Sequence, residues 1–277
     1  MQHVEIIDQE HFEKNYHRLK APKALAHLVD FYWQTKFDNL WNEYPKGFSD
    51  ALFPNIGYSY LLNLGTPFVM QVGHQKFSMK TDGFLPRHQS IECFHQKDNC
   101  LFGIKFKISP VIFEKKINFA EYTSGIFPLS YLMEKAVIMQ LKKAASFEER
   151  VGILNDYFLT IIDKNVPGLP ITIVSAILQE CSSTNNFNPS IPVLAAKYHI
   201  SARTLHRYFE QCTGIGTKRT LQILRIRKAV EEMAFSPKSF DFSKYGFYDY
   251  SHFYKNLQQF LPVAALKKIS RNFYRSL

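Results

Sequence analysis

The chain has 277 residues, of which 46% are hydrophobic and 21% are charged, a composition typical of a folded globular protein and not of a disordered or collagen-like one. No apolar run reaches the roughly 18 residues that a membrane-spanning helix needs, and residues 1–20 mix charges instead of forming the apolar core of a secretory signal. The formal net charge is +10, and residues 190–277 hold 15 basic and 5 acidic side chains, so the last third carries the whole excess. A basic segment after a neutral one is typical of proteins that bind polyanions; a merely solubilising basic surface is the alternative.

The pattern of cysteines predicts a reducing, cytoplasmic location. No association with a membrane is expected. None of the four cysteines belongs to a C-x-x-C pair, and they are Cys93, Cys100, Cys181 and Cys212. Cys93 and Cys100 could form a redox-sensitive disulfide across a hairpin, but two buried thiols acting as small apolar groups are favoured.

The first half of the chain is expected to be rich in strands. Short apolar or alternating segments are separated by Gly, Pro and Asn turns, and Gly73-His74 is typical of a hairpin turn. The predicted strands are residues 28–37, 58–64, 68–72, 75–79 and 101–108. Several short strands at this spacing indicate an antiparallel barrel or sandwich.

Helical periodicity replaces the strand pattern after about residue 128. Residues 129–145 and a segment beginning after Ser146 have helical apolar spacing, and Ser146 with Glu149 matches a capping box. Another helix is predicted over 171–181, and the polar, breaker-rich residues 182–190 are the expected linker.

The expected fold class is therefore α+β, with an antiparallel β barrel or sandwich, following helices, and an all-α C-terminal domain. The predicted division is a β-rich domain at 1–128, a helical connector that could dimerise at 129–181, and a basic domain at 188–277.

The basic segment contains a predicted helix-turn-helix unit. A short helix over 191–198, a tight turn at His199-Ile200 and a helix over 202–211 capped by Ser201 follow one another. The inner face of the second helix is apolar and its outer face is cationic, which suits a helix that enters the major groove. Ordinary solvated arginines on a surface helix are the alternative interpretation.

A similar arrangement follows further along the chain. Residues 239–245 precede Gly246-Phe247, and Asp249 can cap a helix over 250–260. Between the two units, residues 217–234 predict a helix of about 27 Å at 1.5 Å per residue. Such a rod could hold two recognition helices near the roughly 34 Å between successive major-groove faces.

Residues 188–262 resemble the AraC/XylS family of transcription regulators. The family's S-x-x-x-L-x-R-x-F run, its linking-helix pattern and its G-F-x-D-x-S-H-F block are matched by Ser201, Leu205, Arg207, Phe209, Gly214, Lys218, Arg225, Ala229, Gly246, Phe247, Asp249, Ser251, His252 and Phe253. The departures from the family pattern are Thr217, Asp241, Phe242, Pro262 and Ala265. They lead to the hypothesis that the first unit contacts bases and the second mainly holds phosphates.

The resemblance implies an all-α DNA-binding domain with two helix-turn-helix units at 188–277, which follows a β-rich sensor or effector domain at 1–128. It also implies a bacterial, sequence-specific DNA-binding transcriptional activator or repressor that is not an enzyme. Its implied partners are double-stranded DNA, a small-molecule effector, a second copy of the chain and RNA polymerase. The expected base contacts are Arg203, Thr204, His206, Arg207, Tyr250, Ser251, Tyr254 and Lys255. The expected phosphate contacts are Lys218, Arg219, Lys238, Lys244, Lys267 and Lys268.

The N-terminal region resembles, more weakly, a sensor-like domain found ahead of AraC-type modules. This implies an effector-binding or dimerising β domain but names no ligand. A weak prediction for an aromatic effector pocket takes strand residues Phe31, Trp33, Tyr58, Tyr60 and Phe106.

No catalytic residue, cofactor or metal site is predicted. His74, His88 and His95 lie in the β region, but their spacing lacks an H-x-H or H-E-x-x-H pattern. Two other classes stay open from the sequence: a cupin-like metal-binding enzyme domain fused to a DNA-binding tail, and a protein-interaction scaffold with degenerate helix-turn-helix units.

Overall fold

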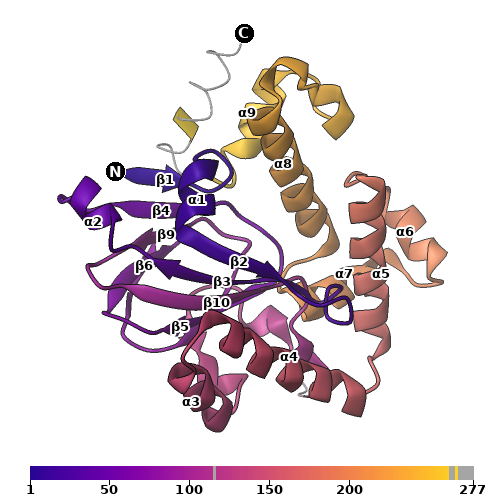
Figure 1. Ribbon diagram of the computed structural model, residues 1–277. Coiled ribbons are helices and arrows are strands. Elements are labelled where there is room, and N and C mark those ends of the chain that lie inside the picture. Colours follow the sequence, from indigo (N-terminus) through magenta and orange to yellow (C-terminus); the bar gives the residue numbers. More distant parts are fainter. Residues whose placement is uncertain (115–116, 262–265, 268–277) are drawn as a thin grey trace.

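The computed structural model describes residues 1–114, 117–261 and 266–267. Figure 1 shows the two β-sheets on one side, α3 and α4 beneath them, α5 to α7 on the other side, and α8 with α9 standing above. This arrangement confirms the expected α+β fold class, with a β-rich N-terminal part and a helical C-terminal part.

Two sheets form the N-terminal part. The five-stranded sheet has the order β1-β4-β9-β6-β7, with bounds Gln2–Val4, Ser49–Leu52, Ile91–Phe94, Phe68–Val72 and Gln75–Met79. The six-stranded sheet has the order β11-β8-β5-β10-β3-β2, with bounds Phe127–Pro128, Gly83–Pro86, Tyr58–Asn63, Cys100–Phe106, Val29–Lys36 and Tyr16–Lys20. Among the described pairings β1 with β4 is parallel, and the others are antiparallel.

The six-stranded sheet is buried on both faces. Trp33 and Leu101 belong to the apolar cluster that also contains Phe68 and Met70 of the other sheet. On the opposite face the ring of Phe106 packs 5.4 Å, centroid to centroid, from that of Phe158 on α4. Burial on both faces explains why β5 is almost uninterrupted in apolar and aromatic residues instead of alternating.

A glycine in β10 is required by this packing. A Cβ atom on Gly103 would lie 2.1 Å from Cε2 of Trp33 on the neighbouring strand. Only glycine leaves room for the indole ring of Trp33 to lie against β10 at this point. The packing of the core between the sheets therefore depends on the register in which β10 pairs with β3.

The helices follow the predicted order with changed bounds. They are α1 Gln9–Asn15, α2 Leu40–Glu43, α3 Lys135–Lys143, α4 Phe147–Lys164, α5 Leu169–Thr184, α6 Ile191–Lys197, α7 Ala202–Thr213, α8 Thr217–Phe235 and α9 Tyr250–Leu257. Short 3₁₀ turns are η1 Pro110–Ile112, η2 Phe119–Glu121, η3 Leu129–Tyr131, η4 Pro237–Ser239 and η5 Phe242–Tyr245. The Ser146 cap is confirmed, since its Oγ accepts a hydrogen bond from the Glu149 amide at 3.0 Å.

The largest differences from the sequence prediction lie in three helical segments. The segment 129–145 is split into η3 and α3, the helix predicted over 171–181 extends to Thr184 and shortens the linker, and α9 ends at Leu257 instead of Phe260. No helix of the described residues is long and apolar enough to cross a bilayer. One apolar cluster runs from Val4 to Leu266 through all three predicted segments, so the domain division stays a prediction.

Candidate nucleic-acid interface

The turn between α6 and α7 is tight and is closed by backbone hydrogen bonds. His199 adopts a positive φ of 55°, and the Ile200 amide donates back to the Ala195 carbonyl at 3.1 Å. Ser201 then caps α7, because its Oγ accepts from the Thr204 amide at 3.0 Å. The capping serine fixes where α7 starts and therefore which side chains its first turn presents.

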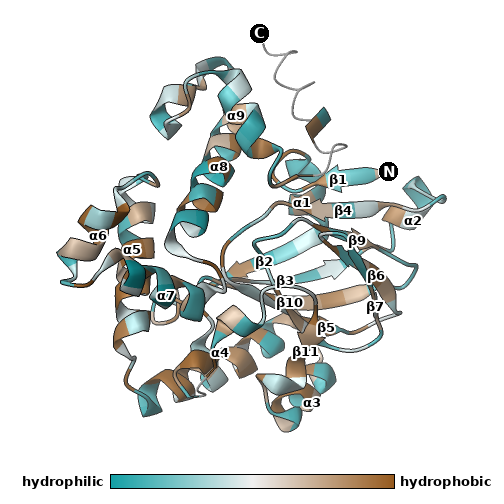
Figure 2. Ribbon diagram, turned by 180° about the vertical axis from the view of Figure 1, so that it is seen from behind, coloured by the Kyte–Doolittle hydropathy of each residue, from teal (hydrophilic) through white to brown (hydrophobic). Residues whose placement is uncertain are grey.

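Helix α7 is strongly two-sided. Leu205, Phe209 and Cys212 are fully buried, whereas Arg203 and Arg207 are exposed. In Figure 2, α7 is largely hydrophilic in colour and the adjoining α5 is largely hydrophobic. The exposed side therefore carries two guanidinium groups that face solvent from the first and second turns of the helix.

The other two predicted base contacts on α7 have protein partners nearby. Thr204 is half-buried and its Oγ1 lies 2.9 Å from the Oγ of Ser201. His206 is exposed, and its Nε2 lies 3.3 Å from Oε1 of Glu210 one turn later. A protonated His206 is thus partly neutralised by Glu210, which leaves the two arginines as the main cationic groups of this face.

The C-terminal end of α7 is seated on the β domain. Gly214 ends the helix with φ 78°, and a Cβ atom there would lie 2.3 Å from the hydroxyl of Tyr58 on β5. That hydroxyl donates to the carbonyl of Phe119 at 2.8 Å. Glycine is required both by the left-handed backbone and by this close approach, so the β domain and the base of α7 form one packed unit.

Helix α8 connects the two units and spans about 28 Å at 1.5 Å per residue. Lys218 is exposed at its start. Arg219 is half-buried, with its guanidinium carbon 4.0 Å from the centroid of the Phe260 ring and Nη1 3.5 Å from Oε1 of Gln259. Partial burial lowers the pKa of Arg219, and the side chain braces α8 against the end of the second unit.

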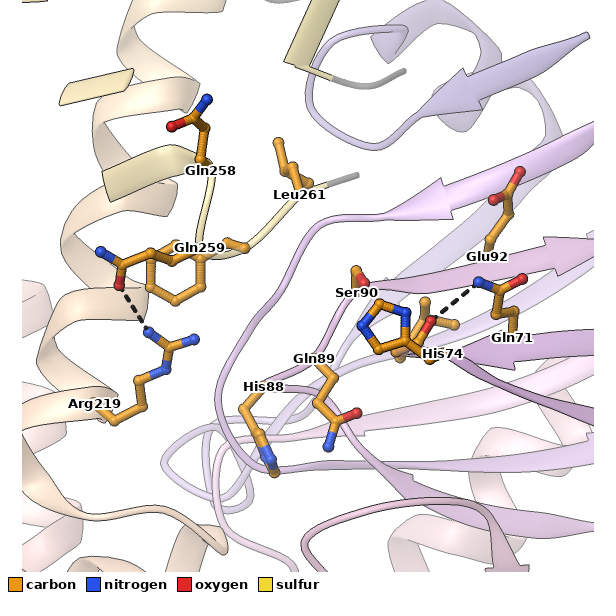
Figure 3. A pocket seen from close by; sticks show the side chains of 13 residues that line it. Gln71, His74, His88, Gln89, Ser90, Glu92, Arg219, Gln258, Gln259 and Leu261 are labelled. Carbon is orange, nitrogen blue, oxygen red and sulfur yellow. Dashed lines mark hydrogen bonds between the residues drawn. The ribbon is translucent and has the colours of Figure 1, made fainter. Parts of the chain in front are cut away.

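Arg219 also borders a cleft of about 440 Å³ between the helical module and the β domain (Figure 3). Residues 258–261 line the same side as Arg219, while His74, His88 and Glu92 lie across from them. Burial, followed by the charge of Arg219, lowers the pKa of His88 to about 4. His88 is therefore neutral at physiological pH and adds no positive charge to the cleft.

The second unit is reduced in its first helix. Where α6 precedes α7, two short 3₁₀ turns, η4 and η5, precede α9, and Gly246 ends η5 at φ 66°. Asp249 caps α9 by accepting from the His252 amide at 2.7 Å. The departures noted at Asp241 and Phe242 fall at η5: Asp241 caps it and Phe242 packs 5.5 Å from the ring of Phe253.

The predicted base contacts of α9 differ in exposure. Ser251 and Lys255 are exposed. Tyr250 and Tyr254 are half-buried and stack with ring centroids 5.7 Å apart. The outer face of α9 thus offers one cation and two partly covered phenol rings, a weaker cationic surface than that of α7.

The predicted phosphate contacts are spread along the module. Lys238, Lys244 and Lys267 are exposed, and Lys244 Nζ lies 3.7 Å from Oε1 of Glu232. Lys268 lies outside the described residues, as do Pro262 and Ala265 of the family comparison.

The five aromatic residues predicted to line an effector pocket are divided between two apolar clusters. Tyr58, Tyr60 and Phe106 are fully buried in the cluster that joins the six-stranded sheet to the helices. Trp33 is buried in the cluster between the sheets, and Phe31 is half-buried and packs against that cluster. The clefts of about 440, 290, 530, 510 and 160 Å³ among the described residues are lined by other side chains, so the pocket stays a prediction.

A buried ion cluster that sequence patterns did not indicate joins the two halves. Glu5 Oε1 lies 3.3 Å from Nη2 of Arg227 on α8, and its Oε2 lies 3.3 Å from Nη2 of Arg87. Arg227 Nη1 also donates to the Phe53 carbonyl at 3.3 Å. Although burial alone would raise it, the charges of Arg227, Arg87 and Arg18 lower the pKa of Glu5 to about 2. Residues 222 positions apart meet here, so no local motif could have revealed the contact.

The histidine and cysteine expectations are resolved separately. His74, His88 and His95 do not form a group of potential metal ligands among the described residues. Cys93 is buried and Cys100 half-buried, and both are free thiols with raised pKa values caused mainly by burial. A buried protonated thiol is unreactive, which agrees with their expected packing role.

The fold defines a class: an α+β chain in which a β-rich N-terminal part with two sheets is packed against a basic, helical C-terminal part. Searches with the chain match no protein-family model and no curated protein sequence. Solved structures similar to it include ToxT from Vibrio cholerae O395, at 12% identity over 92% of this chain and 97% of that one, with a TM-score of 0.44. A 1.65 Å structure of Vibrio cholerae ToxT has 11% identity over 92% and 98% of the two chains and a TM-score of 0.46. An unsaturated fatty acid bound ToxT from strain SCE256 has 11% identity over 79% and 91%, with a TM-score of 0.43. At these values the likeness carries no argument about function.

Proposed function

We propose that this chain is a sequence-specific, double-stranded DNA-binding transcription regulator of the AraC/XylS kind. The observation that carries the proposal is the capped helix α7, with Arg203 and Arg207 exposed on its outer face and its apolar stripe buried. An N-terminally capped helix after a tight turn is the element that enters the major groove in helix-turn-helix proteins.

The two exposed arginines suit base recognition. A guanidinium can donate two hydrogen bonds to O6 and N7 of guanine, and each good bidentate contact is worth about 1–3 kcal/mol of discrimination. Arg203 and Arg207 take this role, with Thr204 and His206 beside them. The remaining expected contacts, Tyr250, Ser251, Tyr254 and Lys255, contribute less because α9 exposes one cation and two covered rings.

The exposed lysines supply phosphate contacts that are independent of sequence. Lys218, Lys238, Lys244 and Lys267 take this role. Arg219 joins them only if it leaves its position over Phe260. Since η4 and η5 replace a full helix in the second unit, that unit acts mainly as a phosphate clamp.

The β domain acts as the regulatory part of the proposed protein. Tyr58 contacts the end of α7 and Glu5 pairs with Arg227 on α8. A ligand that alters the conformation of the β domain at these contacts therefore shifts both helices. The proposal thus includes a small-molecule effector, a second copy of the chain and RNA polymerase as partners, and assigns no catalytic role.

In the test, the full-length protein is titrated into a fluorescently labelled DNA duplex of random sequence. Binding is measured by fluorescence anisotropy at several salt concentrations. We expect the logarithm of the association constant to fall linearly with the logarithm of the salt concentration, with a slope of about −0.9 for each phosphate neutralised. The double variant Arg203→Ala/Arg207→Ala should lose preference for a selected duplex while it retains most of the salt-sensitive binding. Absence of salt-sensitive duplex binding by the wild type would leave the interaction-scaffold interpretation in its place.

A further inference from the structure

A buried carboxylate in the β domain is surrounded by three histidines. Asp50 lies on β4 with no exposed surface. Its Oδ1 is 2.8 Å from Nε2 of His11 and 3.4 Å from Nδ1 of His3, and its Oδ2 is 3.2 Å from Nε2 of His95. Oδ2 also accepts a hydrogen bond from the Tyr16 hydroxyl at 2.6 Å. Burial alone would raise the pKa of Asp50, but the nearby imidazoles of His11, His3 and His95 outweigh it and hold that pKa well below its usual range.

The two carboxylate oxygens have different surroundings. Tyr16 and His95 fix Oδ2, and His95 is itself held because its Nδ1 lies 2.8 Å from Oδ1 of Asn99. Oδ1 faces His3 and His11 instead. Carboxylates that bind metal ions are commonly held in position by hydrogen bonds from the residues around them. Here such bonds fix Oδ2, and Oδ1 is left directed at the two imidazoles.

His3 contributes a second, independent observation. Its Nδ1 is buried and makes no hydrogen bond, although the side chain is only 7% exposed. An unpartnered buried nitrogen is unfavourable by roughly 1–3 kcal/mol, and a bound cation would satisfy it. The ligand atoms of His3, His11 and Asp50 all lie within 4.8 Å of one another.

We propose that His3 Nδ1, His11 Nε2 and Asp50 Oδ1 bind one divalent transition-metal ion. Two imidazoles and one carboxylate are a ligand set that zinc and related ions accept, with an open position for water.

Loading the site requires one side-chain movement and the release of one proton to solvent, because His11 Nε2 can bind an ion only after it loses the proton that it shares with Asp50 Oδ1. The His3 and His11 rings are stacked with centroids 3.6 Å apart and planes 7° apart. Since the lone pair of an imidazole nitrogen lies in the ring plane, two parallel rings cannot both point at one ion. His3 must therefore turn about its Cβ–Cγ bond, and it can do so without losing a hydrogen bond at Nδ1.

A cleft gives the ion access to this group. A cavity of about 530 Å³ is lined by His3 and His11 together with three acidic side chains and one lysine, which are Asp8, Glu10, Glu43 and Lys14. The excess of carboxylates over ammonium groups on these side chains attracts cations.

The site also lies close to the contact that holds α8. His3 is on β1, and Glu5, which pairs with Arg227, follows two residues later. A turn of His3 toward an ion is transmitted along this short segment to the carboxylate that holds α8. The ion thus acts as an effector of DNA binding, and this part of the inference rests on the proposed function.

The first experiment measures the metal site without DNA. Full-length protein without a histidine tag is stripped with chelator and titrated with Co²⁺, and visible absorption and bound cobalt are recorded. The expected result is one Co²⁺ per chain with d–d bands of nitrogen and oxygen ligands. His3→Gln and His11→Gln should weaken binding at least ten-fold, and His74→Gln, which changes an exposed histidine, should not. Thermal melts verify that each variant is folded. Absence of stoichiometric cobalt in the wild type, or equal affinity in all three variants, would overturn the site.

The second experiment measures duplex binding with and without Co²⁺. Wild-type affinity should change at least three-fold on loading, and His3→Gln should show no change. Cobalt bound at the site with unchanged DNA affinity would overturn the effector role alone. Failure to bind DNA in both states would overturn the proposed function and would leave the metal site standing on its own spectrum.

Discussion

Neutralising Glu5 tests whether a buried ion cluster holds the β domain to helix α8. Glu5→Gln keeps the shape of the side chain but removes the charge that lies 3.3 Å from both Arg227 and Arg87. The difference between an ordinary glutamate pKa of 4.5 and the value of about 2 in the folded chain corresponds to about 3 kcal/mol of folding free energy. The same order, about 3–5 kcal/mol, is found when one partner of a buried ion pair is removed.

The sign of the pH dependence follows from the lowered pKa. Because folding favours ionised Glu5, its stabilisation is fully present above pH 4.5 and is lost as the pH falls through about 2. Glu5→Gln should therefore unfold with a free energy about 3 kcal/mol lower than wild type at pH 7. The gap between the two proteins should narrow between pH 4.5 and pH 2.

The assay is urea unfolding followed by circular dichroism at pH 7, 4.5 and 3, with Glu13→Gln as the control because Glu13 is exposed. Equal free energies of unfolding for Glu5→Gln and Glu13→Gln at pH 7 would refute the argument, since the cluster would then contribute no more than a solvated carboxylate.

Three further changes test individual contacts. Ser201→Ala removes the cap of α7 and should lower the free energy of unfolding by about 1 kcal/mol, measured by urea unfolding against Ser251→Ala, which changes an exposed serine. Gly214→Ala places a Cβ atom 2.3 Å from the Tyr58 hydroxyl in a left-handed backbone and should destabilise by at least about 1–2 kcal/mol; an unchanged thermal melt would contradict the packing of α7 on the β domain. Lys238→Ala should weaken all duplexes alike and reduce the magnitude of the salt slope by about 0.9, whereas a change in sequence preference would assign this residue to base recognition.

The parts of the fold that sequence predicted well are those set by local chemistry. Strands 68–72 and 75–79 were predicted with the bounds that β6 and β7 have, because Gly73 supplies the positive φ of 58° that the hairpin needs. The Ser201 cap was predicted for the same reason, since a capping serine and the helix it starts are adjacent in the chain.

The parts that sequence missed depend on distant partners. Strand β1 has only three residues, and its pairing with β4 joins positions 47 residues apart. The group of His3, His11 and Asp50 comes from three separate elements and has no spacing that a motif could detect. The aromatic residues predicted for an effector pocket pack in the two apolar clusters, and their role in ligand binding stays a prediction.

The central claim is that α7 recognises bases, and selection from a random duplex library with the full-length chain tests it most directly. The account predicts enrichment of one short block, with Arg207→Ala losing about 1–3 kcal/mol of preference at one base position. The bases next to this block, where the reduced second unit binds, should show weak sequence preference or none. A library that stays random, or a selected block that Arg207→Ala leaves unchanged, would contradict the assignment of α7 as the recognition helix.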